Sequence, residues 1–216
     1  DLGGFAASTY KRGISFINIP TSLLGMVDAS IGGKTGFNLN HLKNNIGTFS
    51  PAKMVICDAD FLDTLPNDEL KSGFAEVVKH ALISDKKLWI SIKKTPFKKL
   101  NWKNIISKTV ELKNNIIITD PHEKGNRKKL NFGHTFGHAI ESYYLEKGTP
   151  ILHGEGVFMG MTLETELSYL SNFEKNEIKD YIMNNFKLPD IPAKKELIKF
   201  LRNDKKNKLN KINFSL

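Results

Sequence analysis

The sequence predicts a short α/β segment followed by a longer, nearly all-helical domain. Up to about residue 62, turn glycines alternate with short apolar runs, and the runs at residues 14–19 and 54–57 have the length and composition of buried strands. Beyond Pro66 glycines become rare, and apolar residues recur at helical spacing. We therefore expect one domain at residues 1–62 and a second at residues 63–216.

Helical patterns follow one another through the second part. The first begins near Asn67, where Asp68 and Glu69 supply acidic residues for a first turn and Phe74 and Val77 belong to an apolar stripe. Further helical patterns cover residues 102–118, 136–145, 157–170, 175–185 and 193–202. No apolar run reaches the roughly 18 to 20 residues that a membrane-spanning helix requires. We expect no membrane partner.

The chain carries a formal net charge of +9. Such an excess suits nucleic acid or a membrane surface, but it suits equally a substrate that carries phosphate and carboxylate groups. Lysines such as Lys93, Lys94, Lys98 and Lys99 occur in runs that are typical of solvated helix faces. A basic module that binds nucleic acid would show steeply salt-dependent binding, but no recognition-helix or aromatic RNA-binding signature accompanies the lysines. We favour a small anionic substrate and expect no nucleic-acid partner.

The cysteine content and the first residues of the chain indicate the cellular compartment of the protein. Cys57 is the only cysteine, so no disulfide can form within one chain. The chain begins at Asp1 without an initiator methionine and without the basic and apolar regions of a signal peptide. These features favour a piece of a cytoplasmic protein.

The run Gly32-Gly33-Lys34-Thr35-Gly36 invites comparison with a phosphate-binding P-loop. The first glycine of such a loop would stand at Asp28, where a carboxylate would repel phosphate. Asp28, Lys34, Lys43 and Asn44 are instead charged or amide side chains among glycines, where a ligand can approach the backbone closely. The alternative is a surface turn with incidental lysines, and spacing alone does not decide between them.

Histidines and one glutamate form a second candidate group. His134 and His138 are four residues apart, which places them on one face of a helix, and His153 supplies a third imidazole. Glu76 lies in an apolar pattern, where an ionised carboxylate is costly unless it is paired or bound to a metal. Two imidazoles and one carboxylate are the ligands expected of a catalytic zinc site with an open position.

Other interpretations of these residues remain open. The histidines can satisfy local backbone groups instead, and Glu76 can pair with Lys79 or form a rival ligand pair with His80. Lys79 shares a helix face with Glu76 and can reach the same cavity. Arg127 is suited to bidentate recognition of a carboxylate or phosphate, and can anchor an anionic substrate beside a metal at His134.

Many short motifs together resemble the 3-dehydroquinate synthase family over nearly the whole chain. They include Asp1-Leu2-Gly3-Gly4-Phe5, Pro20-Thr21-Ser22-Leu23-Leu24, Val27-Asp28-Ala29-Ser30, Phe61-Leu62-Asp63-Thr64-Leu65, Glu76-Val77-Val78-Lys79, Leu130-Asn131-Phe132-Gly133-His134 and His153-Gly154-Glu155. The resemblance implies the α/β remnant of a dinucleotide-binding domain, followed by an all-α multi-helical domain that holds a metal. It further implies an active site in the cleft between them, a homodimer, and an absent first nucleotide-binding segment.

The resemblance also assigns roles to positions. The implied metal ligands are Glu76, His134 and His153, which leaves His138 as a nearby polar or proton-handling residue. The implied NAD contacts are Asp1, Thr21, Ser22, Lys34, Lys43, Phe61 and Thr64. The implied substrate contacts are Asp28, Lys34, Asn44, Lys79, Lys113, Arg127, Asn131 and His138, with Arg12 reaching the neighbouring subunit and one of Lys205 and Lys206 contributing.

The implied reaction converts 3-deoxy-D-arabino-heptulosonate 7-phosphate into 3-dehydroquinate and phosphate in the shikimate pathway. It proceeds by transient NAD-dependent oxidation, phosphate elimination and intramolecular aldol closure, with Zn²⁺ or alternatively Co²⁺. A related sugar-phosphate cyclase or a metal-dependent polyol dehydrogenase on the same scaffold are the competing interpretations. Lys79, Arg127 and Asn131 suit an anionic substrate and favour a cyclase. Because half of the implied cofactor site is absent, we expect the chain by itself to be inactive.

Overall fold

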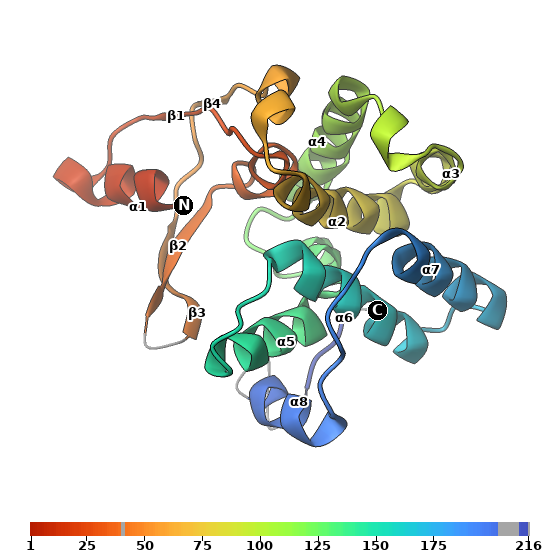
Figure 1. Ribbon diagram of the computed structural model, residues 1–216. Coiled ribbons are helices and arrows are strands. Elements are labelled where there is room, and N and C mark those ends of the chain that lie inside the picture. Colours follow the sequence, from red (N-terminus) through yellow and green to blue (C-terminus); the bar gives the residue numbers. More distant parts are fainter. Residues whose placement is uncertain (40–41, 203–211, 216) are drawn as a thin grey trace.

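A computed structural model describes residues 1–39, 42–202 and 212–215, and the side-chain account leaves out residues 38, 39 and 42–44. A body of packed helices carries a smaller N-terminal part with two short sheets (Figure 1). The predicted order, an α/β segment and then a helical domain, is confirmed.

The N-terminal part contains two separate strand pairs. β1 (Ile17–Asn18) pairs in parallel with β4 (Met54–Val55), and β2 (Lys34–Leu39) forms an antiparallel hairpin with β3 (Leu42–Phe49). The helical pieces around them are α1 (Leu2–Thr9), η1 (Tyr10–Arg12) and η2 (Gly25–Ala29). The hairpin was not predicted, because the glycine-rich run beginning at Gly32 has the composition of a loop.

Both predicted strand runs form strands, but the expectation that they are buried is wrong. Ile17 is 53% exposed and Met54 is 55% exposed. A parallel sheet is buried only when layers cover both of its faces. Among the described residues this sheet consists of two strands and lacks such layers, so its apolar side chains stay accessible.

The predicted helices are confirmed, with shifted ends. The helices and 3₁₀ turns of this part are η3 (Ala59–Thr64), α2 (Asn67–Ser84), α3 (Lys86–Lys94), η4 (Phe97–Lys99), α4 (Trp102–Thr119), η5 (Asn126–Asn131), α5 (His134–Glu146), α6 (His153–Leu167), α7 (Asn172–Asn185) and α8 (Lys194–Leu201). Helix α5 begins at His134 rather than residue 136, and α6 begins at His153 rather than residue 157. Histidine and glycine in these first turns hide the start of the apolar pattern.

Helix α2 is the centre of the core. Every residue from Ser72 to Ala81 is buried, because α2 packs against α4 and α6. Phe74 is 0% exposed and meets the rings of Phe97 and Trp102 edge-on, at centroid distances of 5.1 and 5.9 Å. A helix buried around its whole circumference places its polar side chains in the interior, where they require partners.

Helices α5 and α6 approach each other through glycines. A Cβ atom on Gly160 would lie 1.8 Å from the carbonyl oxygen of Gly133, and one on Gly137 would lie 3.0 Å from the carbonyl oxygen of Gly156. Only glycine permits this separation of the two backbones. The contact brings the first turns of α5 and α6, with their histidines, to the same region as α2 (Figure 1).

Substitution of Gly160 by alanine should therefore separate the two helices. We expect Gly160→Ala to lower the free energy of unfolding by about 3 kcal/mol, the upper end of typical overpacking costs. Gly3→Ala, at an exposed position of α1 where no atom lies within 4 Å of the new Cβ, is the control and should leave stability unchanged or raise it slightly. Urea denaturation of both variants measures the difference, and equal stabilities would contradict the close contact.

No helix within the described ranges has the length and apolar character needed to cross a membrane.

Candidate metal centre and anion site

Three side chains from three helices converge on one point. Glu76 comes from the middle of α2, whereas His134 and His153 are the first residues of α5 and α6. Their ligand atoms all lie within 4.8 Å of one another. Oε1 of Glu76 is 3.3 Å from Nε2 of His134 and 3.2 Å from Nε2 of His153. The structure thus brings together the three residues that were predicted to bind a metal.

In both histidines Nδ1 has a hydrogen-bond partner away from Glu76, and this partner determines that Nε2, the nitrogen facing Glu76, is the one with the lone pair. Nδ1 of His134 lies 3.1 Å from the carbonyl oxygen of Phe132, and Nδ1 of His153 lies 2.6 Å from Oε1 of Glu141. Both oxygens accept, so each Nδ1 carries the hydrogen. In the neutral rings, the two Nε2 lone pairs then point at a carboxylate oxygen. Three lone-pair donors around one point require a cation between them, and the set fits a zinc ion with an open position.

Without a metal, a proton takes this place. Burial by itself lowers the pKa of His153, but its hydrogen bonds to Glu141 and Glu76 outweigh burial and raise that pKa to about 9. Burial raises the pKa of Glu76, yet the Lys79 ammonium and the His134 ring hold it well below its ordinary value. Burial and Lys79 lower the pKa of His134. The metal-free centre therefore contains an ionised carboxylate, one charged imidazole and one neutral imidazole.

The raised pKa of His153 predicts a pH-dependent stability in the presence of a chelator. A group whose pKa is higher in the folded state contributes stability that is complete below its unfolded value of 6.5 and is lost as pH rises through about 9. We expect the free energy of unfolding to fall across this window, and His153→Gln to flatten the decline. The exposed His122 is the control, because His122→Gln should keep the wild-type slope. A wild-type profile that is already flat would contradict the prediction.

A buried basic cluster adjoins the three converging residues. Nζ of Lys113 lies 2.7 Å from Oδ1 of Asp28, and Nζ of Lys79 lies 3.7 Å from the same oxygen. Lys79 also forms an ion pair with Oε2 of Glu76. Burial raises the pKa of Asp28, but Lys113 and Lys79 outweigh this and hold it below its ordinary value. Two ammonium groups and a metal would leave this region positively charged, which favours an anionic ligand.

His80 does not join the converging residues. Its Nδ1 lies 2.6 Å from the backbone oxygen of Glu76, and its Nε2 lies 3.8 Å from Oδ1 of Asp28. Burial, reinforced by Lys79, lowers the pKa of His80 to about 4, so the ring is neutral. Asp28, Glu76 and His80 also lie close enough to share an ion. Both carboxylates of that group already face lysine ammonium groups, so it suits a metal less well than Glu76 with His134 and His153.

The glycine-rich segment meets the helical domain through two side chains. Glu123 forms an ion pair with Lys34 and accepts a hydrogen bond from Asn131. Arg127 is buried and donates from Nη1 to the oxygen of Pro121, at 2.5 Å, and from Nη2 to the oxygen of Gly32, at 3.0 Å. Two predicted substrate residues, Lys34 and Asn131, therefore share Glu123 as a partner, and a third, Arg127, holds the backbone two residues before Lys34.

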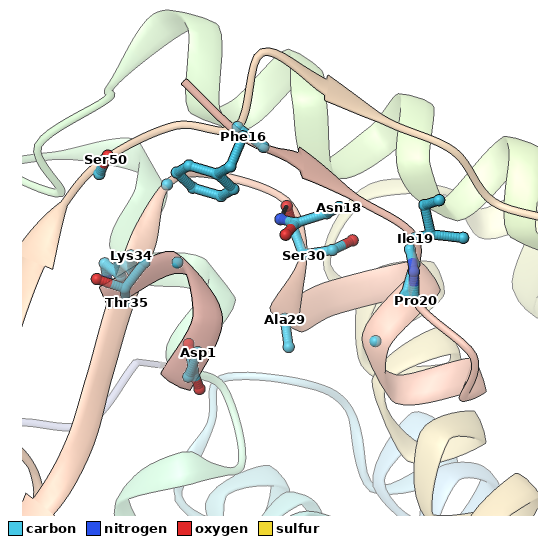
Figure 2. A pocket seen from close by; sticks show the side chains of 14 residues that line it. Asp1, Phe16, Asn18, Ile19, Pro20, Ala29, Ser30, Lys34, Thr35 and Ser50 are labelled. Atoms are coloured by element: carbon cyan, nitrogen blue, oxygen red, sulfur yellow. Dashed lines mark hydrogen bonds between the residues drawn. The ribbon is translucent and has the colours of Figure 1, made fainter. Parts of the chain in front are cut away.

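Of the predicted NAD contacts, Asp1 and Lys34 line a hollow beside the parallel strand pair (Figure 2). Asn18, Pro20, Gly25 and Ser30 also line it. Ser22 adjoins this region and accepts a hydrogen bond from the backbone N–H of Gly25, at 3.2 Å. Thr21 is exposed and follows Pro20 directly. Phe61 and Thr64 lie on η3 and are exposed, and they do not contribute to the hollow.

The remaining predicted residues fall into three groups. His138 is close to the three converging residues, since its ring centroid lies 5.3 Å from that of His134. Arg12 is exposed at the end of η1, so its predicted role in a neighbouring subunit stays a prediction. The side chains of Lys43 and Asn44, and the whole of Lys205 and Lys206, lie outside the described residues.

Two acidic residues in this region were not predicted. Glu141 holds His153 in its tautomer, and Glu123 connects Lys34 with Asn131. A signal for Glu141 existed, because it lies seven residues after His134 and thus on the same face of α5. Glu123 offers no comparable signal, since it lies in a loop with a positive φ of 57°.

Comparison with known proteins identifies the family. The family description "3-dehydroquinate synthase C-terminal" matches residues 73–207, and "3-dehydroquinate synthase N-terminal" matches residues 1–72. The 3-dehydroquinate synthase of Parabacteroides distasonis is 43% identical, with 100% of this chain and 64% of the relative covered. That of Pelagibacter ubique is 40% identical, with 100% and 62% covered. The chain thus spans somewhat less than two thirds of the length of these relatives.

Solved structures of related enzymes share the fold. ValA, a 2-epi-5-epi-valiolone synthase from Streptomyces hygroscopicus solved with NAD⁺ and Zn²⁺ bound, gives a TM-score of 0.81 at 28% identity, covering 94% of this chain and 59% of that one. A 2-deoxy-scyllo-inosose synthase gives a TM-score of 0.76 at 27% identity, covering 93% and 58%. With both family descriptions matched along its length, the chain belongs to the 3-dehydroquinate synthase family.

Proposed function

We propose that the chain supplies the metal- and substrate-binding part of a 3-dehydroquinate synthase, a lyase of the shikimate pathway. The enzyme would convert 3-deoxy-D-arabino-heptulosonate 7-phosphate into 3-dehydroquinate and phosphate. The observation that carries this proposal is the convergence of Glu76, His134 and His153 beside the Asp28, Lys79 and Lys113 cluster. Membership of the family supports the choice of reaction.

The proposed metal is Zn²⁺, with Co²⁺ as an alternative, held by Glu76, His134 and His153. The lone-pair geometry of these residues supports it, as does the zinc ion of ValA. When bound, the metal would supply a Lewis acid that makes a coordinated hydroxyl more acidic, and NAD would supply a hydride acceptor that is restored by the end of the cycle. The proposed NAD contacts are Asp1, Thr21, Ser22, Lys34, Lys43, Phe61 and Thr64.

The residues of this chain would bind and orient the substrate. Lys79 and Lys113 would attract its anionic groups, and Asp28 would hold both ammonium groups in place. His138, next to His134, would handle a proton. The other proposed substrate contacts are Lys34, Asn44, Arg127 and Asn131. We further propose a cytoplasmic homodimer in which Arg12 reaches the partner's site, and the family resemblance is the support for this.

A second candidate is a related sugar-phosphate cyclase, which the likeness to ValA favours. A polyol dehydrogenase is a third class, and it would release reduced NAD. Lys79 and Lys113 are buried beside the candidate metal ligands and would have no anionic partner on an uncharged polyol. This arrangement favours a phosphorylated substrate.

The test compares the 216-residue chain with the longest natural polypeptide that contains it. Each is incubated with the heptulosonate phosphate, NAD⁺ and Zn²⁺, and released phosphate, cyclic product and reduced NAD are measured. We expect the longer polypeptide to release phosphate and dehydroquinate without accumulating reduced NAD, and the 216-residue chain to be inactive. Accumulation of reduced NAD would favour a dehydrogenase. No phosphate from the longer polypeptide with this substrate, but turnover of another sugar phosphate, would favour a related cyclase.

A further inference from the structure

A buried carboxylate on α6 binds the first turn of α5. Glu164 is 0% exposed. Its Oε2 accepts a hydrogen bond from the backbone N–H of Gly133, at 2.8 Å, and its Oε1 accepts from those of Thr135, at 2.9 Å, and Phe136, at 3.2 Å. These N–H groups belong to a helix start whose N-cap, Gly133, has no side chain to bond them. Glu164 therefore performs the capping from a different helix.

The face of α6 that carries Glu164 is shaped for this contact. Gly156, Gly160 and Glu164 are spaced by four residues and lie on one side of the helix. The two glycines let the backbones of α5 and α6 approach, and the next residue along that face places its carboxylate at the start of α5. A negative charge is favourable there, because the amino-terminal end of a helix carries partial positive charge.

The residues bound by Glu164 flank a proposed metal ligand. His134 lies between Gly133 and Thr135, and both N–H groups next to it in the chain are held by the same carboxylate. Gly133 has a positive φ of 77°, so the turn before His134 is one that other residues rarely adopt. Nε2 of His134 is 3.3 Å from Oε1 of Glu76, and a small movement of this turn would change that separation.

We propose that Glu164 is a positioning residue for the metal centre: it fixes the backbone around His134, and so determines metal affinity and coordination geometry. This inference rests on the metal site in the proposed function. Glu164 itself does not touch the metal or the substrate in this proposal. Its influence passes through the N–H groups of Gly133, Thr135 and Phe136 to the imidazole.

The experiment measures metal binding by Glu164→Gln in the 216-residue chain. Glutamine has nearly the same size, but its amide nitrogen cannot accept a hydrogen bond, so at least one of the three N–H groups loses its partner. We expect Zn²⁺ affinity, measured by competition with a chelator, to fall by roughly 10- to 100-fold, as is typical when a partner that orients a ligand is lost. The absorption spectrum of bound Co²⁺ should change, and amide exchange should accelerate at one or more of Gly133, Thr135 and Phe136, whose N–H groups share the carboxylate in the wild type.

Glu166→Gln is the matched control, since it makes the same substitution two residues away on an exposed part of α6. This variant should keep the wild-type affinity for Zn²⁺ and the wild-type absorption spectrum of bound Co²⁺. If Glu164→Gln lowers stability but leaves Zn²⁺ affinity and the Co²⁺ spectrum unchanged, Glu164 is only a structural cap and the proposal is overturned. If the glutamine variant does not fold, Glu164→Asp replaces it, and unchanged metal affinity in that shorter carboxylate overturns the proposal equally. Failure of the wild-type chain to bind either metal would instead overturn the proposed function.

Discussion

His134→Ala is expected to remove stoichiometric zinc from the protein. His134 contributes one of three proposed ligands, and its loss leaves a carboxylate and one imidazole, too few to hold the ion against a chelator. We expect the affinity for Zn²⁺ to fall on the order of 10²- to 10³-fold, given that whole structural zinc sites contribute roughly 10 to 16 kcal/mol. Metal analysis after dialysis against a weak chelator measures the loss.

His122→Ala is the control for this experiment, because His122 is an exposed histidine away from Glu76. It should retain the metal content of the wild type. Equal metal contents in His134→Ala and the wild type would mean that zinc binds elsewhere. Absence of metal from all three proteins after loading would remove the basis of the proposed function.

Lys79→Met is expected to destabilise the fold by about 3 to 5 kcal/mol, the usual cost of removing one partner from a buried ion pair. Lys79 is 1% exposed and is an ion-pair partner of both Glu76 and Asp28. Without it, the ionised carboxylate of Glu76 remains in the interior without this countercharge. Methionine keeps the length of the aliphatic stem, so the loss reflects charge more than packing. Urea denaturation of the metal-free chain gives the free energy.

Helix α2 provides a matched control. Lys71 also pairs with an acidic residue three positions earlier, but its partner Asp68 has a side chain that is 80% exposed. Because exposed pairs contribute about 0 to 1 kcal/mol, Lys71→Met should have little effect. Similar losses in the two variants would show that burial of the Lys79 pair is not what makes it important.

Much of the fold followed from local patterns. The helical spacing of apolar residues after Pro66 predicts α2 and α4 well, since long amphipathic segments carry their own signal. The hairpin of β2 and β3 was missed because the run beginning at Gly32 is rich in glycine and lysine, which favour loops. The exposure of Ile17 and Met54 was also missed, because burial depends on the layers that cover a sheet and not on its own residues.

The candidate site, too, could be predicted only in part from the sequence. Glu76 stood out because a carboxylate in an apolar helical pattern needs a partner, and the family resemblance selected His134 and His153. Glu141 and Glu164 did not stand out, since a glutamate on a helix usually faces solvent. Spacing alone places Glu141 on the face of α5 that carries His134. The contact of Glu164 with the start of α5 comes instead from the close packing of α5 on α6, and it becomes visible only when tertiary contacts are known.

The two oxygens of Glu76 have different neighbours, with imidazoles at Oε1 and the Lys79 ammonium at Oε2. A metal held by Glu76, His134 and His153 would draw electron density from this carboxylate, and would so weaken its ion pair with Lys79 and leave more of the ammonium charge to attract an anionic ligand. The two binding events are then linked thermodynamically. By reciprocity, whatever factor zinc adds to phosphate affinity, phosphate must add to zinc affinity. Such an enzyme would retain its metal most firmly when it is saturated with substrate.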